Sequence, residues 1–405
     1  MSILNNMEKK DLKIAIVHDF LVQYGGAEKV LEAIAEMFPE APIYTLLYNK
    51  EKMHGKFEGK DIRPSYLQKF PKFLRHHYRW LLPFFPVMPE TFNLRDFGLV
   101  ISSSGAWSKG IVTKLDTIHI AYLHSPMRFV WDYHEQYIRE VQSQKLKVQS
   151  SIENFFLRPI LNYLRIWDRL AADRPDHIIV NSKYTQERVK KYYRRESTVI
   201  YPPVNVDNVL DVVSVLNGKN NQLEQAQRLN KRSDRTLEQN YFLIVSRLSP
   251  YKKVDLAVEA FNKLGFPLVI IGEGRQKKYL EKIAGKNVKI LGWKNENELK
   301  KYYTNARAFI FPAIDDFGIT IVESMSYGIP VIAFRDGGAK EIVREGIEGE
   351  FFGAQTAEVL ADSVRRFIGN EKKYNPEEIK KRAQEFSKER FVREFGEYIN
   401  KIFNF

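Results

Sequence analysis

The 405-residue sequence contains no cysteine. Disulfide bonds, cysteine-ligated metals and cysteine nucleophiles are therefore excluded, and the composition fits a reducing compartment such as the cytoplasm. Long hydrophobic runs are also missing. The most apolar segment outside the expected strands, WLLPFFPVMP at Trp80–Pro89, is short and interrupted by prolines. It cannot span a bilayer, which requires about 20 consecutive apolar residues.

Signals for secretion and for metal binding are absent as well. Residues 1–13 lead into an apolar strand without the hydrophobic segment of a signal peptide, so we expect a cytoplasmic protein. No Asp-x-Asp arrangement or histidine cluster argues for a metal, and we expect neither a metal nor another cofactor. Acidic residues are too few to balance the basic ones, 50 against 63, which leaves a net charge of +13. This excess favours an anionic partner: a nucleotide, a membrane surface or a nucleic acid.

The length and the order of apolar segments predict an α/β protein with two domains. Short β-branched runs alternate with helix-length segments along most of the chain. Strands are expected at residues 13–20, 99–104, 118–124, 177–182 and 197–202, and again at 241–248, 267–274, 288–293, 308–313 and 330–334. Continuous apolar strands separated by helices are typical of doubly wound parallel sheets with both faces covered.

The joint between the two series of strands is expected at YPPVNVD, residues 201–207, where two prolines stiffen an extended crossing. This predicts an N-terminal domain of residues 1–203 and a C-terminal domain of residues 204–385. Residues 218–240 are polar and Gln/Asn-rich, and we expect a surface insertion or an exposed helix there. Residues 386–405 contain an amphipathic helix that needs a docking surface, and we expect it to cross back to the N-terminal domain.

The most informative segment is FIFPAIDDFGITIVESMSYGIPVI, residues 309–332, which indicates a buried strand, an acidic loop, a helix and another strand. Asp315 and Asp316 stand where a helix N-cap is expected. A helix that begins at the end of a strand offers N–H groups and a positive dipole end to an anion. Asp315 and Glu323 lie up to ~12 Å apart along the chain, too far for one acid–base pair. They either hold two ends of a long, phosphate-centred ligand or are a cap and an exposed helical residue.

Two further strand ends carry groups suited to phosphate, because ligands of open α/β sheets lie beyond the carboxyl ends of the strands. Gly25 and Gly26 open a helix after the first strand and allow close approach of a backbone; a plain tight turn is the alternative. Arg247 and Lys252 follow another strand, five positions apart. A planar guanidinium and a compact ammonium together suit a diphosphate.

A third strand end, HSPMR, begins at His124 and closes with Arg128 after the strand at 118–124. A lone histidine in such a place is either a satisfied structural residue or a functional one. Its position at the carboxyl end of a strand favours the functional interpretation.

Five motifs in order carry a family resemblance: GGAEKV (25–30), HSPMRFVWD (124–132), VIYPPVNVD (199–207), SRLSPYKKVDLAVEAF (246–261) and DDFGITIVESMSYGIPVIA (315–333). With them the chain resembles the retaining glycosyltransferases of family 4, and within that family the mannosyltransferases of polysaccharide and O-antigen assembly. The resemblance covers nearly the whole chain. It implies the GT-B fold, in which two Rossmann-like domains face each other across a cleft.

The resemblance also implies roles for individual residues on the donor side. Glu323 matches the second acid of the family's paired-carboxylate motif and would bind the ribose hydroxyls of the donor. Asp315 matches the first acid, which contacts the transferred sugar. That acid is usually glutamate, so the shorter aspartate departs from the pattern, and Asp316 is a second candidate. Backbone amides at the helix start would meet the sugar and the β-phosphate: those of Phe317, Gly318 and Ile319.

Other implied roles surround the departing diphosphate and the sugar. Arg247 and Lys252 would neutralise the diphosphate, and His124 would lie over the sugar, donating to a hydroxyl or steadying positive charge beside the anomeric carbon. The remaining implied donor contacts are Gly25 and Gly26, whose loop would approach the donor, and the backbone at Gly292 and Trp293, which would read the base.

The activity implied by the resemblance is metal-independent transfer with retention, of mannose from GDP-mannose to a glycan or lipid-linked acceptor. The nucleotide-sugar is a substrate, not a cofactor. No second-face nucleophile is evident. We therefore expect a front-face route through an oxocarbenium-like state, in which the donor phosphate helps to deprotonate the acceptor.

On the acceptor side, basic and aromatic residues are interleaved from 62 to 89. This composition suits an anionic membrane interface or single-stranded nucleic acid, and a segment that packs its aromatics onto its own core is equally compatible. The resemblance favours peripheral binding at the inner face of the cytoplasmic membrane, and no nucleic acid is expected. Arg128, Trp131 and Asp132 are candidates for acceptor contact.

Two rival functions fit parts of the pattern. A nucleotide-sugar epimerase can share the fold and the donor, but it would make product without an acceptor. A non-catalytic basic module that binds lipid or nucleic acid would explain the positive net charge. It would not explain Asp315, Glu323 or the five ordered motifs.

Overall fold

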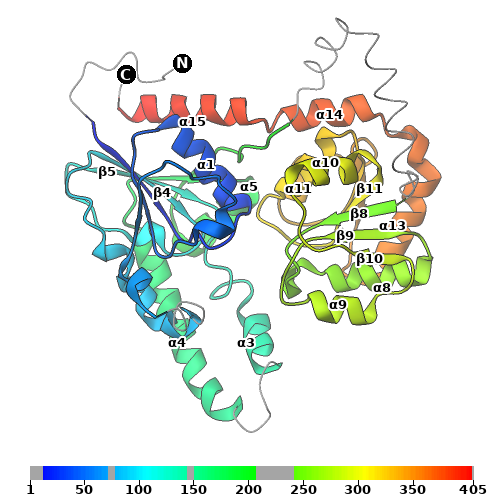
Figure 1. Cartoon of the computed structure of the whole chain (residues 1–405), viewed down its shortest axis with the longest axis horizontal. Helices are drawn as coiled ribbons and strands as arrows, with labels where there is room; N and C mark the ends of the chain where they lie inside the picture. The colour runs from blue at the N-terminus through cyan, green and yellow to red at the C-terminus, as the bar shows by residue number, and fades with distance from the viewer. Residues whose placement is uncertain (1–11, 72–77, 144–149, 207–240, 404–405) are drawn as a thin grey trace, which may run out of the picture. The chain divides into compact units, whose positions relative to one another are not determined.

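The computed structural model describes residues 12–71, 78–143, 150–206 and 241–403, and the chain divides into two compact units (Figure 1). The first unit comprises Met1–Pro203 with Glu389–Phe405, and the second comprises Val204–Lys388. Within the described part of the chain, no helix combines the length and apolarity needed to cross a membrane. The segment predicted to be an insertion, 218–240, lies outside the described residues.

A seven-stranded parallel sheet forms the centre of the first unit, in the order β3-β2-β1-β4-β5-β6-β7. The strands are β1 (Ile14–His18), β2 (Ile43–Thr45), β3 (Ile62–Pro64), β4 (Leu99–Ser104), β5 (Ile118–Leu123), β6 (His177–Val180) and β7 (Thr198–Val199). The strand order reverses between β1 and β4, which pair in parallel. In doubly wound sheets, a crevice for ligands opens at this switch point, beyond the carboxyl ends of the strands.

Helices and short 3₁₀ turns connect the strands of the first unit. The helices are α1 (Gly26–Met37), α3 (His134–Ser143), α4 (Ser150–Ala171), α5 (Lys183–Tyr193) and α15 (Lys388–Ile402). The turns are η1 (Lys50–Met53), η2 (Tyr66–Lys69), η3 (Tyr78–Val87), η4 (Pro89–Thr91) and η5 (Ser108–Gly110). Local caps set the helix starts: the Ser182 hydroxyl accepts the Thr185 N–H and begins α5.

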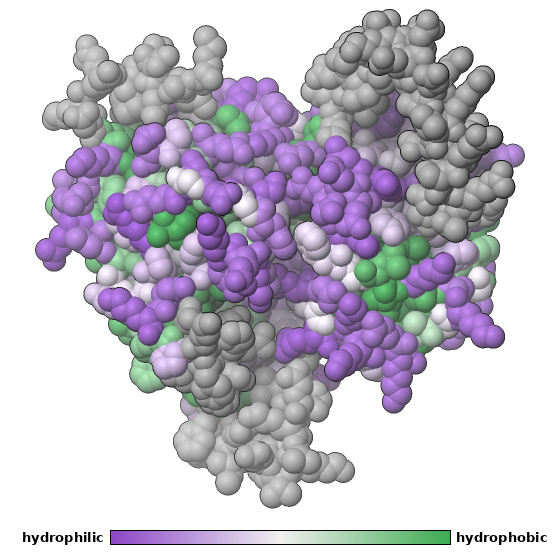
Figure 2. Space-filling view, in the orientation of Figure 1, coloured by the Kyte–Doolittle hydropathy of each residue, from purple (hydrophilic) through white to green (hydrophobic). Residues whose placement is uncertain are grey.

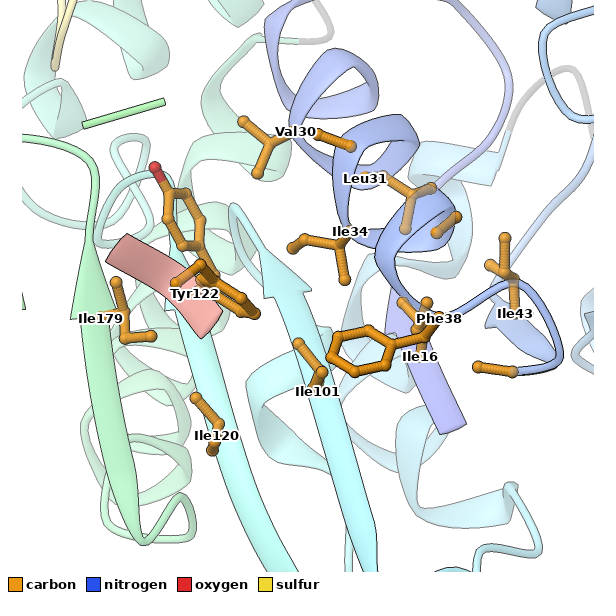
Figure 3. Packing of buried hydrophobic residues seen from close by; sticks show 14 of the residues in the cluster. Ile16, Val30, Leu31, Ile34, Phe38, Ile43, Ile101, Ile120, Tyr122 and Ile179 are labelled. Carbon is orange, nitrogen blue, oxygen red and sulfur yellow. The ribbon is translucent and has the colours of Figure 1, made fainter. Parts of the chain in front are cut away.

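The core of the first unit lies on both faces of its sheet, because successive strand residues point to opposite sides. One face of the sheet meets α1, and Figure 3 shows Ile34 of this helix directed at Ile101 and Tyr122. Phe391 and Phe395 of α15 join the same buried cluster. A fully buried phenylalanine contributes roughly 1.5–3 kcal/mol, so the C-terminal helix is an integral part of this unit.

The second unit contains a six-stranded parallel sheet in the order β10-β9-β8-β11-β12-β13. The strands are β8 (Tyr241–Val245), β9 (Leu268–Ile271), β10 (Val288–Ile290), β11 (Ala306–Phe311), β12 (Val331–Phe334) and β13 (Gly349–Phe352). The helices are α8 (Val254–Leu264), α9 (Lys277–Ile283), α10 (Glu296–Thr304), α11 (Ile319–Ser326), α12 (Ala339–Ile342), α13 (Ala357–Asn370) and α14 (Pro376–Gln384), with turns η6 (Pro250–Lys252) and η7 (Glu371–Lys373). Here the switch point lies between β8 and β11, which also pair in parallel.

The predicted fold class is confirmed: both units are doubly wound around parallel sheets, and each of the ten predicted strands overlaps an observed one. The predicted C-terminal helix also packs on the first unit, through α15. Sequence patterns missed β2, β3 and β13. All three are three or four residues long, and β3 is an edge strand that ends in Pro64. Proline is tolerated at such an edge because no neighbouring strand requires its missing N–H.

Candidate active site

At the switch point of the second unit, the loops after β8 and β11 bring Lys252 and Asp315 together. The Lys252 ammonium forms an ion pair with the Asp315 carboxylate, and their side chains are only 14% and 21% exposed. This partial burial shields the pair from solvent screening, so both charges are held in place. Arg247 leaves the same β8 loop and is exposed to solvent. The predicted phosphate and sugar contacts therefore come from adjacent strand ends.

The start of α11 differs from the prediction. The N-cap is Gly318, with φ of 108° and no side-chain cap, so the expectation that Asp315 or Asp316 caps this helix is wrong. A φ in this range is left-handed backbone, which glycine adopts without strain. The Asp316 side chain is buried, and Phe317 packs edge-on against Phe386 at 5.5 Å. No N-cap side chain accepts an N–H group at the start of α11, whereas the Ile321 N–H donates to the Gly318 carbonyl oxygen at 2.9 Å; the N–H groups of Ile319 and Thr320 are the ones that could meet an anion.

The acidic loop before α11 is braced by Gly337 and Gly338, which follow β12. The Gly338 N–H donates to the carbonyl oxygen of Asp315 at 2.9 Å. A Cβ on Gly338 would lie 2.3 Å from the Phe317 carbonyl oxygen, closer than real Cβ contacts allow. The backbone of 315–317 can therefore take this position only because residue 338 lacks a side chain.

Glu323 lies on α11 and accepts a hydrogen bond of 3.3 Å from the Tyr303 hydroxyl. Tyr303 is buried and stacks on Tyr327 with a ring separation of 5.2 Å. Burial raises the pKa of Tyr303 well above its ordinary value, and the Glu323 carboxylate raises it further, so the hydroxyl remains a donor. Sequence reasoning missed Tyr303, because no motif marks a tyrosine at the end of α10.

The predicted base-reading segment is tied to the loop after β9. Gly292 has φ of 72°, and its carbonyl oxygen accepts the Gly272 N–H at 2.8 Å. A Cβ on Gly292 would approach the Glu273 carboxylate to 2.7 Å. Trp293 is about half exposed, with 53% of its surface accessible. This exposed indole beside a constrained backbone is compatible with contact to a planar base.

In the first unit, the predicted glycine pair marks the start of α1. Gly26 is the first helical residue and Gly25 is the N-cap. The Gly25 N–H donates to Glu28 Oε2 at 2.8 Å. A carboxylate from the following turn therefore already engages this N–H, and the loop is held in one conformation.

His124 lies just after β5 and is connected to the end of β1. Its Nε2 is 2.8 Å from Ser103 Oγ, and the same hydroxyl is 3.0 Å from His18 Nδ1. His18 Nε2 in turn faces Glu28 Oε1 at 3.6 Å. Sequence reasoning did not single out His18, Ser103 or Glu28. Applying the strand-end rule to β1 and β4, as was done for β5, would have found the first two.

Asp19 follows His18 and has a structural function. Its carboxylate accepts backbone N–H groups from four consecutive residues, 105–108, at 2.6–3.0 Å, and the Ser108 hydroxyl at 2.7 Å. These bonds fold the loop after β4 around one buried charge. Ionised hydrogen-bond acceptors of this kind are strong and directional, so the loop beside Ser103 is held rigidly.

The candidates for acceptor contact are joined to α5 and α4. Trp131 stacks on Tyr192 at 4.7 Å and donates through Nε1 to Asp168 at 2.8 Å. Asp132 forms an ion pair with Arg188 and accepts the Tyr192 hydroxyl. Arg128 is half-buried nearby in the sequence. Trp131 and Asp132 therefore have partners within the unit. These partners orient the two side chains, and they also give each side chain a structural role that does not require an acceptor.

Over the described ranges, no group of three or more histidine, aspartate or glutamate side chains is placed to hold a metal ion.

Two family comparisons divide the chain in the same way as its sheets. Residues 24–208 match the family described as Glycosyltransferase Family 4, and residues 225–386 match Glycosyl transferases group 1. The chain belongs to the GT-B glycosyltransferases. The motifs quoted from its sequence thus identified the enzyme class correctly.

Individual relatives of this glycosyltransferase are distant. An uncharacterised glycosyltransferase of Methanocaldococcus jannaschii is 28% identical over 235 residues, 56% of this chain and 60% of the relative. The GDP-mannose-dependent alpha-(1-6)-phosphatidylinositol monomannoside mannosyltransferase of Mycobacterium tuberculosis is 26% identical over 218 residues, 49% of this chain and 54% of the relative. The matches therefore span less than two thirds of these relatives.

Among solved structures, Anabaena HepE in complex with UDP and glucose superposes on this glycosyltransferase with a TM-score of 0.64. The alignment covers 96% of this chain and 99% of HepE, at 16% identity. At this level of identity the likeness concerns the fold.

Proposed function

We propose that this glycosyltransferase transfers mannose from GDP-mannose, with retention and without a metal, to a glycan or lipid-linked acceptor. The observation that carries the proposal is the convergence of Lys252, Asp315 and the uncapped start of α11 at one switch point. A cation and helix N–H groups at the same sheet edge suit a diphosphate, whose developing charge they would stabilise as it departs. The Mycobacterium tuberculosis relative, named as GDP-mannose-dependent, supports the choice of donor.

The donor contacts follow from the chemistry of the second unit. Glu323, held by Tyr303, would accept hydrogen bonds from the ribose hydroxyls. Asp315 would accept from a hydroxyl of the transferred sugar, while its ion pair with Lys252 would hold that ammonium close to the phosphates. Arg247 is exposed in the same loop as Lys252 and would add a bidentate contact to the diphosphate. These interactions would replace the divalent ion that other glycosyltransferases use.

The transfer step that we propose proceeds on the front face of the sugar. The glycosidic phosphate bond breaks to give an oxocarbenium-like state, and the acceptor hydroxyl attacks from the side of the leaving phosphate. The acceptor proton passes to a phosphate oxygen. His124 would lie beside the sugar ring and stabilise it through a hydrogen bond. The alternatives predict different products: an epimerase would alter the nucleotide-sugar without an acceptor, and a binding module would release no nucleoside diphosphate.

A donor panel tests this proposal. The protein is incubated with GDP-mannose, GDP-fucose, UDP-glucose, UDP-galactose and UDP-N-acetylglucosamine, and release of nucleoside diphosphate is followed with and without EDTA. Release from GDP-mannose that EDTA leaves unchanged is the expected result. Turnover of a UDP-sugar alone would refute GDP-mannose as the donor and would favour a uridine nucleotide, the kind named for the HepE complex. Turnover that EDTA abolishes would refute the metal-independent mechanism, and the anomeric configuration of the product tests retention.

Peripheral membrane binding at the cytoplasmic face is the second part of the proposal. Tyr66 and Phe84 are 61% and 60% exposed, whereas the adjacent Leu67 and Phe85 are buried in the core. The basic and aromatic segment 62–89 therefore supplies core residues as well as exposed rings; its residues 72–77 lie outside the described ranges. Lys69 lies over the Tyr66 ring at 5.3 Å, an arrangement of cation and aromatic that suits anionic headgroups.

The membrane proposal is tested by flotation with anionic and with neutral vesicles. The face in Figure 2 is largely hydrophilic where residues are described, with hydrophobic residues in small patches. Tyr66 and Phe84 are the exposed rings that we propose to enter the interface, so the double variant Tyr66→Ser with Phe84→Ser should float less than the wild type. Equal flotation of the variant, or no flotation of either protein at low salt, would refute this assignment.

A further inference from the structure

One guanidinium on α5 contacts both ends of the segment 125–132, which follows β5 and His124. Arg188 donates from one terminal nitrogen to Ser125 Oγ at 2.9 Å. From its other terminal nitrogen it donates to the Asp132 carboxylate, with which it forms an ion pair. The Arg188 side chain is buried, with 6% exposure of the residue. The segment is therefore closed by a side chain from another element, and we name residues 125–132 the Arg188 loop.

The shape of a guanidinium suits this closure. Its N–H donors lie in one plane and point in fixed directions, so two terminal nitrogens can hold two acceptors at the same time. A lysine ammonium is a single point charge on a flexible stem, and it would hold one end of the loop only. The rings of Tyr184 and Tyr192 lie 5.8 and 5.9 Å from the Arg188 guanidinium and limit its movement.

Asp132 engages α5 through both of its carboxylate oxygens. Oδ2 accepts from Arg188, and Oδ1 accepts the Tyr192 hydroxyl. Burial, together with the hydrogen bond to Asp132, raises the pKa of Tyr192 to about 12. The tyrosine therefore keeps its proton near neutral pH and remains a donor. These two contacts favour a role for Asp132 in closing the loop over a role as an acceptor contact.

The Arg188 loop is also attached to α4, near its end, through Trp131. The indole stacks on Tyr192 and donates to Asp168 at 2.8 Å. Asp168 is fully buried and forms an ion pair with the buried Lys109. Breaking a buried pair of this kind is strongly unfavourable, so Asp168 is a fixed point for the indole.

The start of the Arg188 loop adjoins His124, the residue proposed to lie beside the sugar ring. Asn181, just after β6, donates from Nδ2 to the His124 carbonyl oxygen at 2.9 Å. The next residue, Ser125, is held by Arg188. The backbone at His124 is therefore fixed by side chains that belong to α5 and to the turn before it.

We propose that Arg188 is a positioning residue for sugar transfer. Its guanidinium fixes the Arg188 loop and with it the place of His124, and Asp132 acts through Arg188 instead of contacting the acceptor. The inference rests on the proposed function for the part that His124 plays in transfer. The shape of the loop is a property of the first unit and is measured separately.

The shape of the Arg188 loop is followed by ¹H–¹⁵N spectra of the full-length protein labelled at tryptophan. The chain has five tryptophans, and Trp131→Phe assigns the indole signal of Trp131. The stacked Tyr192 ring and the bond to Asp168 make this signal sensitive to the position of the indole. Arg188→Lys should shift the Trp131 signal and leave that of Trp293, in the second unit, unchanged. An unchanged Trp131 signal would overturn the inference.

A second variant and a control keep this measurement independent of how well Arg188→Lys folds. Ser125→Ala removes one contact of the guanidinium and leaves the ion pair of Arg188 intact, and it should shift the Trp131 signal by a smaller amount. Lys190→Ala, on the same helix, should leave the Trp131 signal in place. An unchanged signal in Ser125→Ala, or an equal shift in Lys190→Ala, would count against closure of the loop by Arg188.

Kinetics with the donor identified by the panel test the consequence for transfer. Arg188→Lys and Asp132→Ala should each lower kcat roughly 10- to 100-fold, because a misplacement of about 1 Å can cost about 10²-fold in rate. KM for the donor should stay close to the wild-type value, since its proposed phosphate and ribose contacts belong to the second unit. Wild-type kcat in Arg188→Lys, or a change confined to KM, would overturn the positioning role.

The double variant Asp132→Ala with Arg188→Lys separates the two roles open to Asp132. Residues that act as one unit are non-additive, so kcat of the double variant should equal that of the single variants. Losses that multiply would show that Asp132 acts independently, as an acceptor contact would. Lys190 and Glu196 are the matched control: they pair at 3.4 Å with side chains 69% and 86% exposed, and their alanine variants should keep the wild-type kcat.

The shape of the loop and the part of Arg188 in transfer can fail separately. If no donor releases nucleoside diphosphate, the proposed function and the part of Arg188 in transfer are both refuted, whereas the indole spectra still decide whether Arg188 closes the loop. If the Trp131 signal shifts as expected but kcat does not fall, Arg188 shapes the loop without a part in transfer.

Discussion

Replacing Gly338 by alanine should displace the acidic loop that precedes α11. The backbone of Gly338 has φ of −65° and ψ of −19°, which alanine adopts without strain. The effect of the substitution is therefore purely steric. The added methyl carbon would lie 2.3 Å from the Phe317 carbonyl oxygen, 2.4 Å from its Cα and 2.6 Å from the Asp316 carbonyl oxygen. All three atoms belong to the backbone and cannot rotate away.

The size of the effect follows from these distances. Real Cβ contacts essentially never fall below 3.0 Å, so the loop must retreat by about 0.7 Å from the nearest atom. Overpacking of this kind costs roughly 1–3 kcal/mol of stability. A displacement approaching 1 Å at a reacting centre costs about 10²-fold in rate. We therefore expect kcat/KM for Gly338→Ala to fall roughly 10- to 100-fold, because Asp315 and the α11 N–H groups move together.

The assay is release of nucleoside diphosphate from the donor that the panel identifies, combined with a thermal melt. Gly353→Ala is a matched control in the same unit, because a Cβ there meets nothing within 4 Å and its backbone is not left-handed. It should retain wild-type kcat/KM. A folded Gly338→Ala protein with wild-type kcat/KM would refute the reasoning, since the loop would then have moved without affecting the donor.

Three further substitutions test other parts of the account. Lys252→Ala should lower kcat about 10²–10³-fold through loss of one preorganised charge, whereas Lys278→Ala on α9 should have no effect; near-normal turnover in Lys252→Ala contradicts the leaving-group assignment. Phe395→Ala should reduce the free energy of unfolding, measured by urea titration, by about 3–5 kcal/mol. The exposed Glu397→Ala should change it by no more than about 0.5 kcal/mol, and equal values for the two variants would show that α15 is not part of the core. Burial lowers the pKa of His119 to about 3, so unfolding takes up a proton as the pH falls below about 6.5; stability should drop by about 2 kcal/mol between pH 7 and pH 5, and this drop should vanish in His119→Gln.

The parts of the candidate site that sequence reasoning found are those that follow long, apolar strands. Lys252 and Asp315 were selected because each follows such a strand, and the rule that ligands lie at carboxyl ends holds for any pair of neighbouring parallel strands. Their direct pairing was not predictable, because β8 and β11 are separated by more than 60 residues and only the sheet order makes them neighbours. The N-cap prediction failed for a local reason: an aspartate often caps a helix, but the left-handed Gly318 moved the helix start beyond it.

The amino-acid sequence by itself determined the two doubly wound units, the docking helix at the C-terminus and the enzyme class, because strand length, apolar continuity and motif order are properties of the chain read in sequence. Tertiary structure decided which side chains act together. Ser103 is an ordinary serine within the segment LVISSS, and its neighbours Ser102 and Ser104 are chemically identical to it. The pleat of β4 directs adjacent side chains to opposite faces of the sheet. Ser102 therefore hydrogen-bonds His119 in the core, whereas Ser103 hydrogen-bonds both His18 and His124.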